Sequence, residues 1–146
     1  MERALLGKLW EASWTEGIWI APWSKAVGDL SLSQAAWSPA PGRHCIWQIV
    51  NHVCIWREYT LSQLDGRKGP SREEVRRDNF AMPASKSDAS WQATIDRLRR
   101  THDDFREAIA RPDSSPERLP YHLGHDCYHL GQIMYVRAMQ GLAPIE

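Results

Sequence analysis

The sequence has no long apolar run and no excess of either charge. Nowhere do roughly 18 apolar residues follow one another, so we expect no membrane-spanning helix. The opening MERALLGKLWEAS carries charges throughout and is not expected to act as a signal peptide. Lysine plus arginine equals aspartate plus glutamate at 18 each, which argues against a nucleic acid or an anionic membrane as partner.

Cysteine and phenylalanine are also scarce. Three cysteines, an odd number without a C-x-x-C pair, suit a reducing compartment, and we expect a cytoplasmic protein. Against two phenylalanines stand eight tryptophans, residues that often end up half-buried at pocket rims or subunit contacts. Internal repeats, low-complexity segments and useful strand-like alternation are missing as well. The chain is therefore predicted to be all-α.

The hydrophobic periodicity predicts four long helices. They span about 2–16, 44–65, 88–110 and 120–140, and shorter helical pieces are expected at 18–28, 31–37 and within SREEVRRDNF. A length of 146 residues suits one domain covering the whole chain, 1–146. Four long helices with one long crossover predict a helix bundle.

The predicted helix 44–65 has two different stripes. One is a plain core stripe of Ile46, Val50, Val53, Cys54, Leu61 and Leu64. The other mixes polar and aromatic side chains: Cys45, Gln48, His52, Trp56 and Tyr59. Such a stripe is typical of a pocket wall, although a subunit interface has a similar composition.

The last predicted helix carries the clearest functional pattern. His125 and His129 are four residues apart, which stacks both imidazoles on one helical face within reach of a single metal ion. A third ligand must come from elsewhere, and His52 lies near the middle of the other suitable helix. Gln132, one turn further, is placed to hydrogen-bond an imidazole or a water. Gly131 is unfavourable inside a helix, and we expect it to permit close approach of another helix.

The neighbouring residues have plainer interpretations. His102 is expected to be a hydrogen-bonded core histidine, and His122 a supporting group at the margin of the site rather than a fourth ligand. Asp126 either orients an imidazole or faces solvent. The cysteines are poor ligand candidates, since Cys54 and Cys127 project away from the histidines and only Cys45 lies near them.

Two segments carry a resemblance to a known family. PGRHCIWQIVNHVCIWREYTLSQLDG and YHLGHDCYHLGQIMYVRAMQG resemble the second and last helices of the DinB/YfiT-like four-helix metalloproteins, including a His-Asp/Glu-x-x-His-x-Gly-Gln signature. The family's metal histidines match His52, His125 and His129. Leu130 stands where many relatives have arginine, so an anion or thiol-cofactor contact made by that arginine is not carried over.

The resemblance implies an architecture and a cofactor. These are an up-down-down-up bundle, usually dimeric, and a divalent ion such as zinc or nickel, with manganese or iron as alternatives, that keeps open coordination positions. Characterised members include enzymes that use low-molecular-weight thiols as S-transferases or isomerases, while many others resemble them in fold and have no assigned reaction.

Three functions therefore remain open. The first is a metal-dependent hydrolase or thiol-dependent transferase acting on a small molecule, with Gln48, Trp56 and Tyr59 lining its pocket. The second is a non-catalytic metal-binding or stress-related dimeric module, in which metal affinity falls below about pH 6 as histidines protonate. The third is a homodimeric assembly protein that pairs through its tryptophan-rich first helix and a second face of its last helix.

Overall fold

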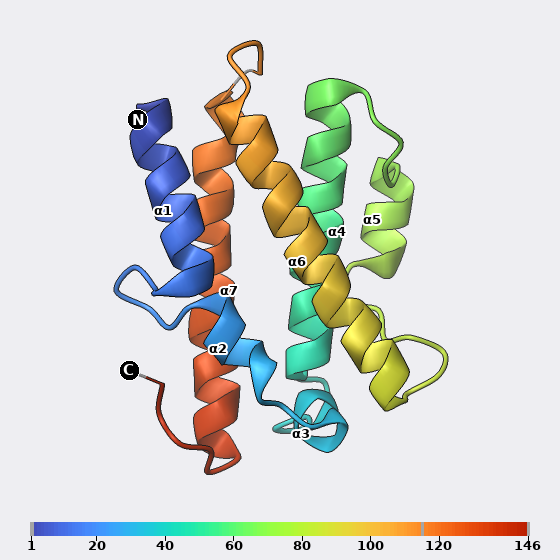
Figure 1. The fold of residues 1–146 in the computed structure, drawn as a ribbon. Helices are drawn as coiled ribbons and strands as arrows, with labels where there is room; N and C mark the ends of the chain where they lie inside the picture. Colours follow the sequence, from blue (N-terminus) through green and yellow to red (C-terminus); the bar gives the residue numbers. More distant parts are fainter. Residues whose placement is uncertain (1, 115, 146) are drawn as a thin grey trace.

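The computed structural model describes residues 2–114 and 116–145, and every regular element in these ranges is helical (Figure 1). The four longest helices are α1 (Arg3–Thr15), α4 (Ile46–Asp65), α6 (Asp88–Ala110) and α7 (Leu119–Met139). The connections contain α2 (Trp23–Gly28), α3 (Leu32–Ala36), α5 (Arg72–Asp78) and the short 3-10 helix η1 (Pro116–Arg118). The all-α prediction is thus confirmed.

Most helix bounds agree with the periodicity. α6 has the predicted limits, and α4 ends at Gly66, whose φ of 68° gives the left-handed C-cap. The predicted piece 18–28 is wrong in its first half, because only residues 23–28 are helical. Pro22 is the N-cap of α2, and Trp19 before it has a positive φ of 64° and an exposed side chain.

The N-terminus of α5 is fixed by a capping box. The Ser71 hydroxyl accepts from the Glu74 N–H at 3.2 Å, and the Glu74 carboxylate accepts from the Ser71 N–H at 2.7 Å, which is a capping box. The helix packs along α4, on the outer side of the molecule in Figure 1. Its C-terminal end therefore delivers Asn79 and Phe80 to the side of α4 that carries His52.

The long helices pack so that α4 lies beside α7. α4 contacts both α6 and α7, and α1 contacts the same two helices. One buried cluster joins α2 and α3 to α4, α6 and α7, and a second joins α1 to α6 and α7. No helix among the described residues combines the length and apolarity needed to cross a membrane.

Half of the eight tryptophans belong to the buried core. Trp10, Trp23 and Trp47 are fully buried, and the Trp10 N–H donates to the carbonyl of His102 at 2.9 Å. Trp10 lies inside the second core cluster, so it is not available for the homodimer contact that the third open function places on α1.

Candidate metal centre

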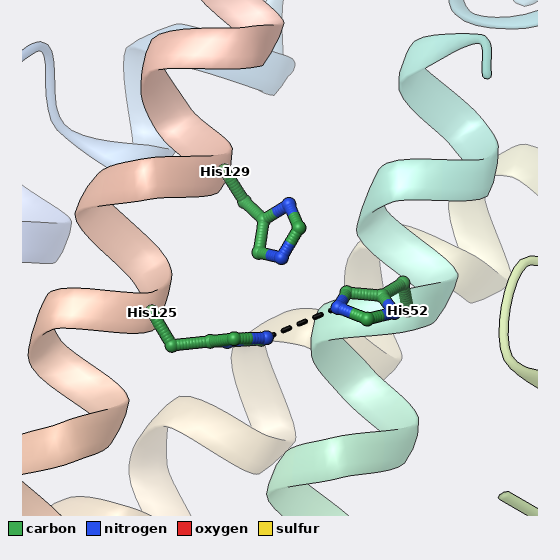
Figure 2. A group of neighbouring side chains, drawn as sticks. All are labelled: His52, His125 and His129. Atoms are coloured by element: carbon green, nitrogen blue, oxygen red, sulfur yellow. Dashed lines mark hydrogen bonds between the residues drawn. The ribbon is translucent and has the colours of Figure 1, made fainter. Parts of the chain in front are cut away.

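Three histidines meet between α4 and α7. His52 extends from α4 toward His125 and His129, which lie one turn apart on α7, and the three rings face one another (Figure 2). The Nε2 atoms of His52 and His125 are 3.0 Å apart, and one ring nitrogen from each histidine lies within 4.8 Å of the others. The exposed fraction is 8% for His52 and 5% for His129, while the His125 side chain is 28% exposed.

The side chain of Asn79 determines which ring nitrogen of His52 carries the proton. Trp56 Nε1 can only donate, and it donates to Oδ1 of Asn79 at 2.9 Å. The same oxygen lies 2.8 Å from Nδ1 of His52, so Nδ1 must carry the proton and donate to it. The His52 Nε2 atom, which faces the other two histidines, is therefore left with a lone pair.

His129 has an equivalent arrangement within its own helix. Its Nδ1 atom lies 2.7 Å from Oε1 of Gln132, an acceptor, so this nitrogen also carries the proton. The amide of Gln132 is held from its other side, because Nε2 donates to the hydroxyl of Tyr128 at 3.1 Å. The prediction that Gln132 hydrogen-bonds an imidazole agrees with this contact.

His125 lies beside a buried carboxylate. Its Nδ1 atom lies 3.7 Å from Oδ1 of Asp126, beyond hydrogen-bond distance, and within the described residues neither atom has a hydrogen-bond partner. The other oxygen of Asp126 is ion-paired with Arg57, and neither side chain has any exposed surface. Of the two readings of Asp126, the structure places it beside the imidazole and away from solvent. Because Nδ1 faces an anion, it is the nitrogen expected to hold the proton.

The converging lone pairs make the cluster a good fit for a cation. Neutral rings protonated at Nδ1 would turn two Nε2 lone pairs toward each other at 3.0 Å, which is repulsive without a proton or a cation between them. Zinc and similar ions bind imidazole nitrogen at about 2.0–2.1 Å, so two ligands of one ion lie at most about 4.2 Å apart. The His52–His125 separation is inside that limit, and the set of three needs only a small side-chain adjustment.

Burial also favours the neutral, ligating form of the histidines. It lowers the pKa of His52 to about 4, with further lowering from the neighbouring His129. The pKa of His129 is lowered to about 4 by burial and then by His125. At neutral pH both rings are uncharged, as metal binding requires.

The remaining predicted residues lie around the cluster rather than in it. Gln48 accepts from the Cys45 N–H at the start of α4 and donates to the Phe80 carbonyl at 3.1 Å. His122 pairs with the Thr60 hydroxyl at 2.7 Å. A hollow of about 280 Å³ adjoins the exposed edge of His125, lined by Trp56, Tyr59, Thr60, Arg118, Tyr121, His122 and His125.

Two predictions about single residues are wrong. Gly131 was expected to permit close approach of another helix, yet a Cβ atom added there meets no atom of the described residues within 4 Å. His102 is a core residue as predicted, but within the described part of the chain neither of its ring nitrogens has a hydrogen-bond partner. It is held instead by stacking on Trp10, with ring centroids 5.1 Å apart.

Three residues that matter to the site were not found from the sequence. Asn79 orients His52, Phe80 stacks on the His52 ring with centroids 4.2 Å apart, and Arg57 pairs with Asp126. The first two lie in a polar connection with no metal-site spacing, and their only local signal is the capping box that starts α5. The sequence offers a clearer indication for Arg57, because it is a charged residue among apolar positions of α4 that are predicted to be buried.

Together the fold and the site define an all-helical protein whose two facing helices gather three buried or half-buried histidines. A family model described as the DinB superfamily matches residues 21–133, and the chain belongs to that family. No curated protein and no solved structure gives a significant match.

Proposed function

We propose that the protein binds one divalent metal ion through His52, His125 and His129 and uses it for chemistry on a small molecule. The observation that carries the proposal is the convergence of three imidazoles, of which His52 and His129 have their outer nitrogens hydrogen-bonded to proton acceptors, so that their inner nitrogens are free to ligate. We further propose an up-down-down-up arrangement of α1, α4, α6 and α7, as in the family resemblance. Zinc or nickel is the expected ion, since imidazole suits both.

Three neutral ligands leave the positive charge of the ion unneutralised. A divalent ion in this setting supplies the charge that lowers the pKa of a coordinated water or thiol toward neutrality. The chain's own contribution is to hold the ligands: Asn79 and Gln132 fix two rings, and Asp126 aligns the third. We therefore propose a metal-dependent hydrolase or thiol-dependent transferase.

The hollow beside His125 supports a substrate site. Trp56, Tyr59 and Tyr121 provide aromatic surface, and Arg118 is the one arginine in its lining. Such a lining suits a small substrate with an apolar part and an anionic group. Because His125 is the most exposed of the three histidines, a substrate in this hollow would reach the centre from that side.

Elemental analysis tests the metal site. Protein purified without a histidine tag is expected to hold close to one equivalent of zinc, nickel or another divalent ion per chain. His52→Ala and His129→Ala should each reduce that content to a small fraction of an equivalent. His102→Phe serves as the matched control, because it removes a buried histidine outside the cluster and should leave the metal content unchanged. Equal metal content in all four proteins would overturn the proposed site.

Catalysis needs a separate test. Metal-loaded protein is mixed with hydrolysable esters, or with small thiols and electrophilic acceptors, and its rate is compared with that of His52→Ala. A metal-dependent rate supports the enzyme. A large fall in melting temperature on chelation, with no turnover of any substrate tried, would instead favour the non-catalytic module.

A further inference from the structure

A groove of about 760 Å³ runs between α7 and the loop that precedes α4. Tyr128, Gly131 and Tyr135 line it from α7, and Arg43 lines it from the loop. It is separate from the hollow beside His125, because among the described residues the two have no lining residue in common. Small-molecule sites typically measure about 300–1,000 Å³. The groove is therefore large enough for a ligand of its own.

The α7 side of the groove contains a gap between two tyrosine rings. Tyr128 and Tyr135 are 64% and 69% exposed, so most of each side chain is left uncovered. Gly131 lies between them on the same helix, about 4.5 Å along the axis from Tyr128 and about 6 Å from Tyr135. Aromatic pairs prefer centroid separations of about 4.5–7 Å. A flat ring over Gly131 can therefore contact a tyrosine on either side.

Gly131 keeps the floor of this gap open. Glycine is the least favourable residue in a helix interior apart from proline. Within the described chain nothing lies within 4 Å of a Cβ atom added at Gly131, so close packing does not explain the glycine. Because Gly131 lines the groove, a side chain there would occupy part of the groove. A ligand that crosses α7 at this point explains why the side chain is missing.

The loop side of the groove is ordered by its own contacts. The Ser38 hydroxyl donates to the Arg43 carbonyl at 2.7 Å, and the Arg43 N–H donates to the Ala40 carbonyl at 3.1 Å. The next residue, His44, stacks its ring on Phe80 with centroids 3.8 Å apart. A wall that is ordered before binding reduces the entropy lost when a ligand binds.

The charge of the groove favours an anion. Its described lining contains one arginine, Arg43, and no aspartate, glutamate or lysine. The Arg43 side chain belongs to none of the ion pairs of the described residues. α4 begins at Ile46, three residues later, so the positive end of its dipole lies near Arg43. The planar guanidinium of arginine matches the two oxygens of a carboxylate.

We infer that the groove binds a small aromatic carboxylate, with its ring over Gly131 and its carboxylate at Arg43. Gln132 also lines the groove and accepts from His129, so the bound ligand lies next to the histidine cluster. None of the contacts that hold the ligand involves a metal. Binding is therefore expected with or without a metal ion at the three histidines.

The first experiment measures charge preference with 3-phenylpropionate and its neutral analogue 3-phenylpropionamide, titrated into the protein and followed by saturation-transfer NMR. The wild type is expected to bind the acid with a Kd of about 1 mM or tighter. The amide should bind about fivefold more weakly, which is the contribution of an exposed ion pair. Arg43→Gln should bind both probes with the affinity of the amide. Arg100→Gln is the matched control, because it removes an exposed arginine of α6 outside the groove and should keep the preference.

The second experiment tests the position of the ligand by filling the gap. Gly131→Leu should lose detectable binding of both probes. Gly124→Leu is the matched control, because it adds the same side chain at an exposed glycine of α7 outside the groove and should bind as the wild type does. Neither variant should melt below the wild type, since both positions are open and leucine is a better helix former than glycine.

Chelator distinguishes this groove from the metal centre. The Kd of 3-phenylpropionate should be the same before and after metal is removed, so a protein without a metal site would still bind the probe. Binding that disappears with chelator would place the probe at the histidines and overturn the inference. No binding to the wild type, equal binding of acid and amide, or equal binding by Gly131→Leu and Gly124→Leu would overturn it as well.

Discussion

Arg57 of α4 and Asp126 of α7 form an ion pair from which water is excluded on both sides. Arg57 also donates to the Leu98 carbonyl, and its guanidinium lies over the Trp10 ring at 4.9 Å. Burial, the largest single effect, raises the pKa of the Asp126 carboxyl, yet the charge of Arg57 and its hydrogen bond to that carboxyl hold the pKa below its ordinary value. The pair thus fixes an anion beside the Nδ1 atom of His125.

Replacing Asp126 should therefore damage stability and metal binding together. Asp126→Asn leaves the Arg57 charge buried without an anion, which typically lowers the free energy of unfolding by about 3–5 kcal/mol. It also removes the anion beside His125, and loss of such a partner costs about 10–100-fold in metal affinity. Urea unfolding of the metal-free protein and competition with a chelating dye measure the two effects.

A double variant separates the effect on stability from the effect on metal binding. Arg57→Met with Asp126→Leu removes both charges and should recover most of the lost stability, since buried pairs can be exchanged for apolar residues at little cost. Its metal affinity should stay low, because His125 still has no anion beside its Nδ1 atom. If the double variant regained the wild-type affinity, Asp126 would have no part in aligning His125.

Asn79 offers a cleaner test of ligand orientation. Asn79→Ala removes the acceptor shared by His52 and Trp56, so the His52 ring is free to rotate and to change tautomer. We expect metal affinity to fall about 10–100-fold with a small change in melting temperature of the metal-free protein. Asn51→Ala is the matched control, because the Asn51 side chain donates to the Ala81 carbonyl in the same connection and, among the described residues, has no hydrogen bond to a histidine. Equal affinities in the two variants would contradict the role of Asn79.

The sequence predicted the three clustered histidines better than the residues that surround them. His125 and His129 share a helical face through their spacing alone, and a histidine in the middle of α4 was the natural third member. Asn79 could not be predicted, because its role depends on how α5 packs against α4, which no local periodicity encodes. Gly131 illustrates a different limit. The sequence shows that glycine is unfavourable inside a helix, but it does not show whether that position faces the core or solvent, because this depends on how the helices pack.

Metal-free protein should lose stability as the pH falls from about 6.5 to about 4. The pKa of His52, His129 and His122 is lowered by burial to about 4, against 6.5 for an ordinary histidine. Between these pH values the histidines are protonated in the unfolded chain but remain neutral in the native state. The free energy of unfolding therefore decreases as the pH falls. Each such histidine contributes up to about 1.4 kcal/mol per pH unit. Urea midpoints between pH 4 and pH 7 measure this slope, and a flat profile would contradict it.

His102 should account for a separable part of that slope. Burial, the largest effect, lowers the pKa of His102 to about 3, helped by the positive charge of nearby Arg57. In His102→Phe the ring can keep its stacking on Trp10 and no longer brings two buried nitrogens without partners into the core. We expect the variant to be more stable than the wild type at pH 7 by about 1–3 kcal/mol. Its stability should also fall less steeply below pH 6.5, since one fewer histidine takes up a proton on unfolding. Urea unfolding at pH 7 and pH 5 checks both, and a variant less stable than the wild type at both values would show that His102 has a polar contact the native fold requires.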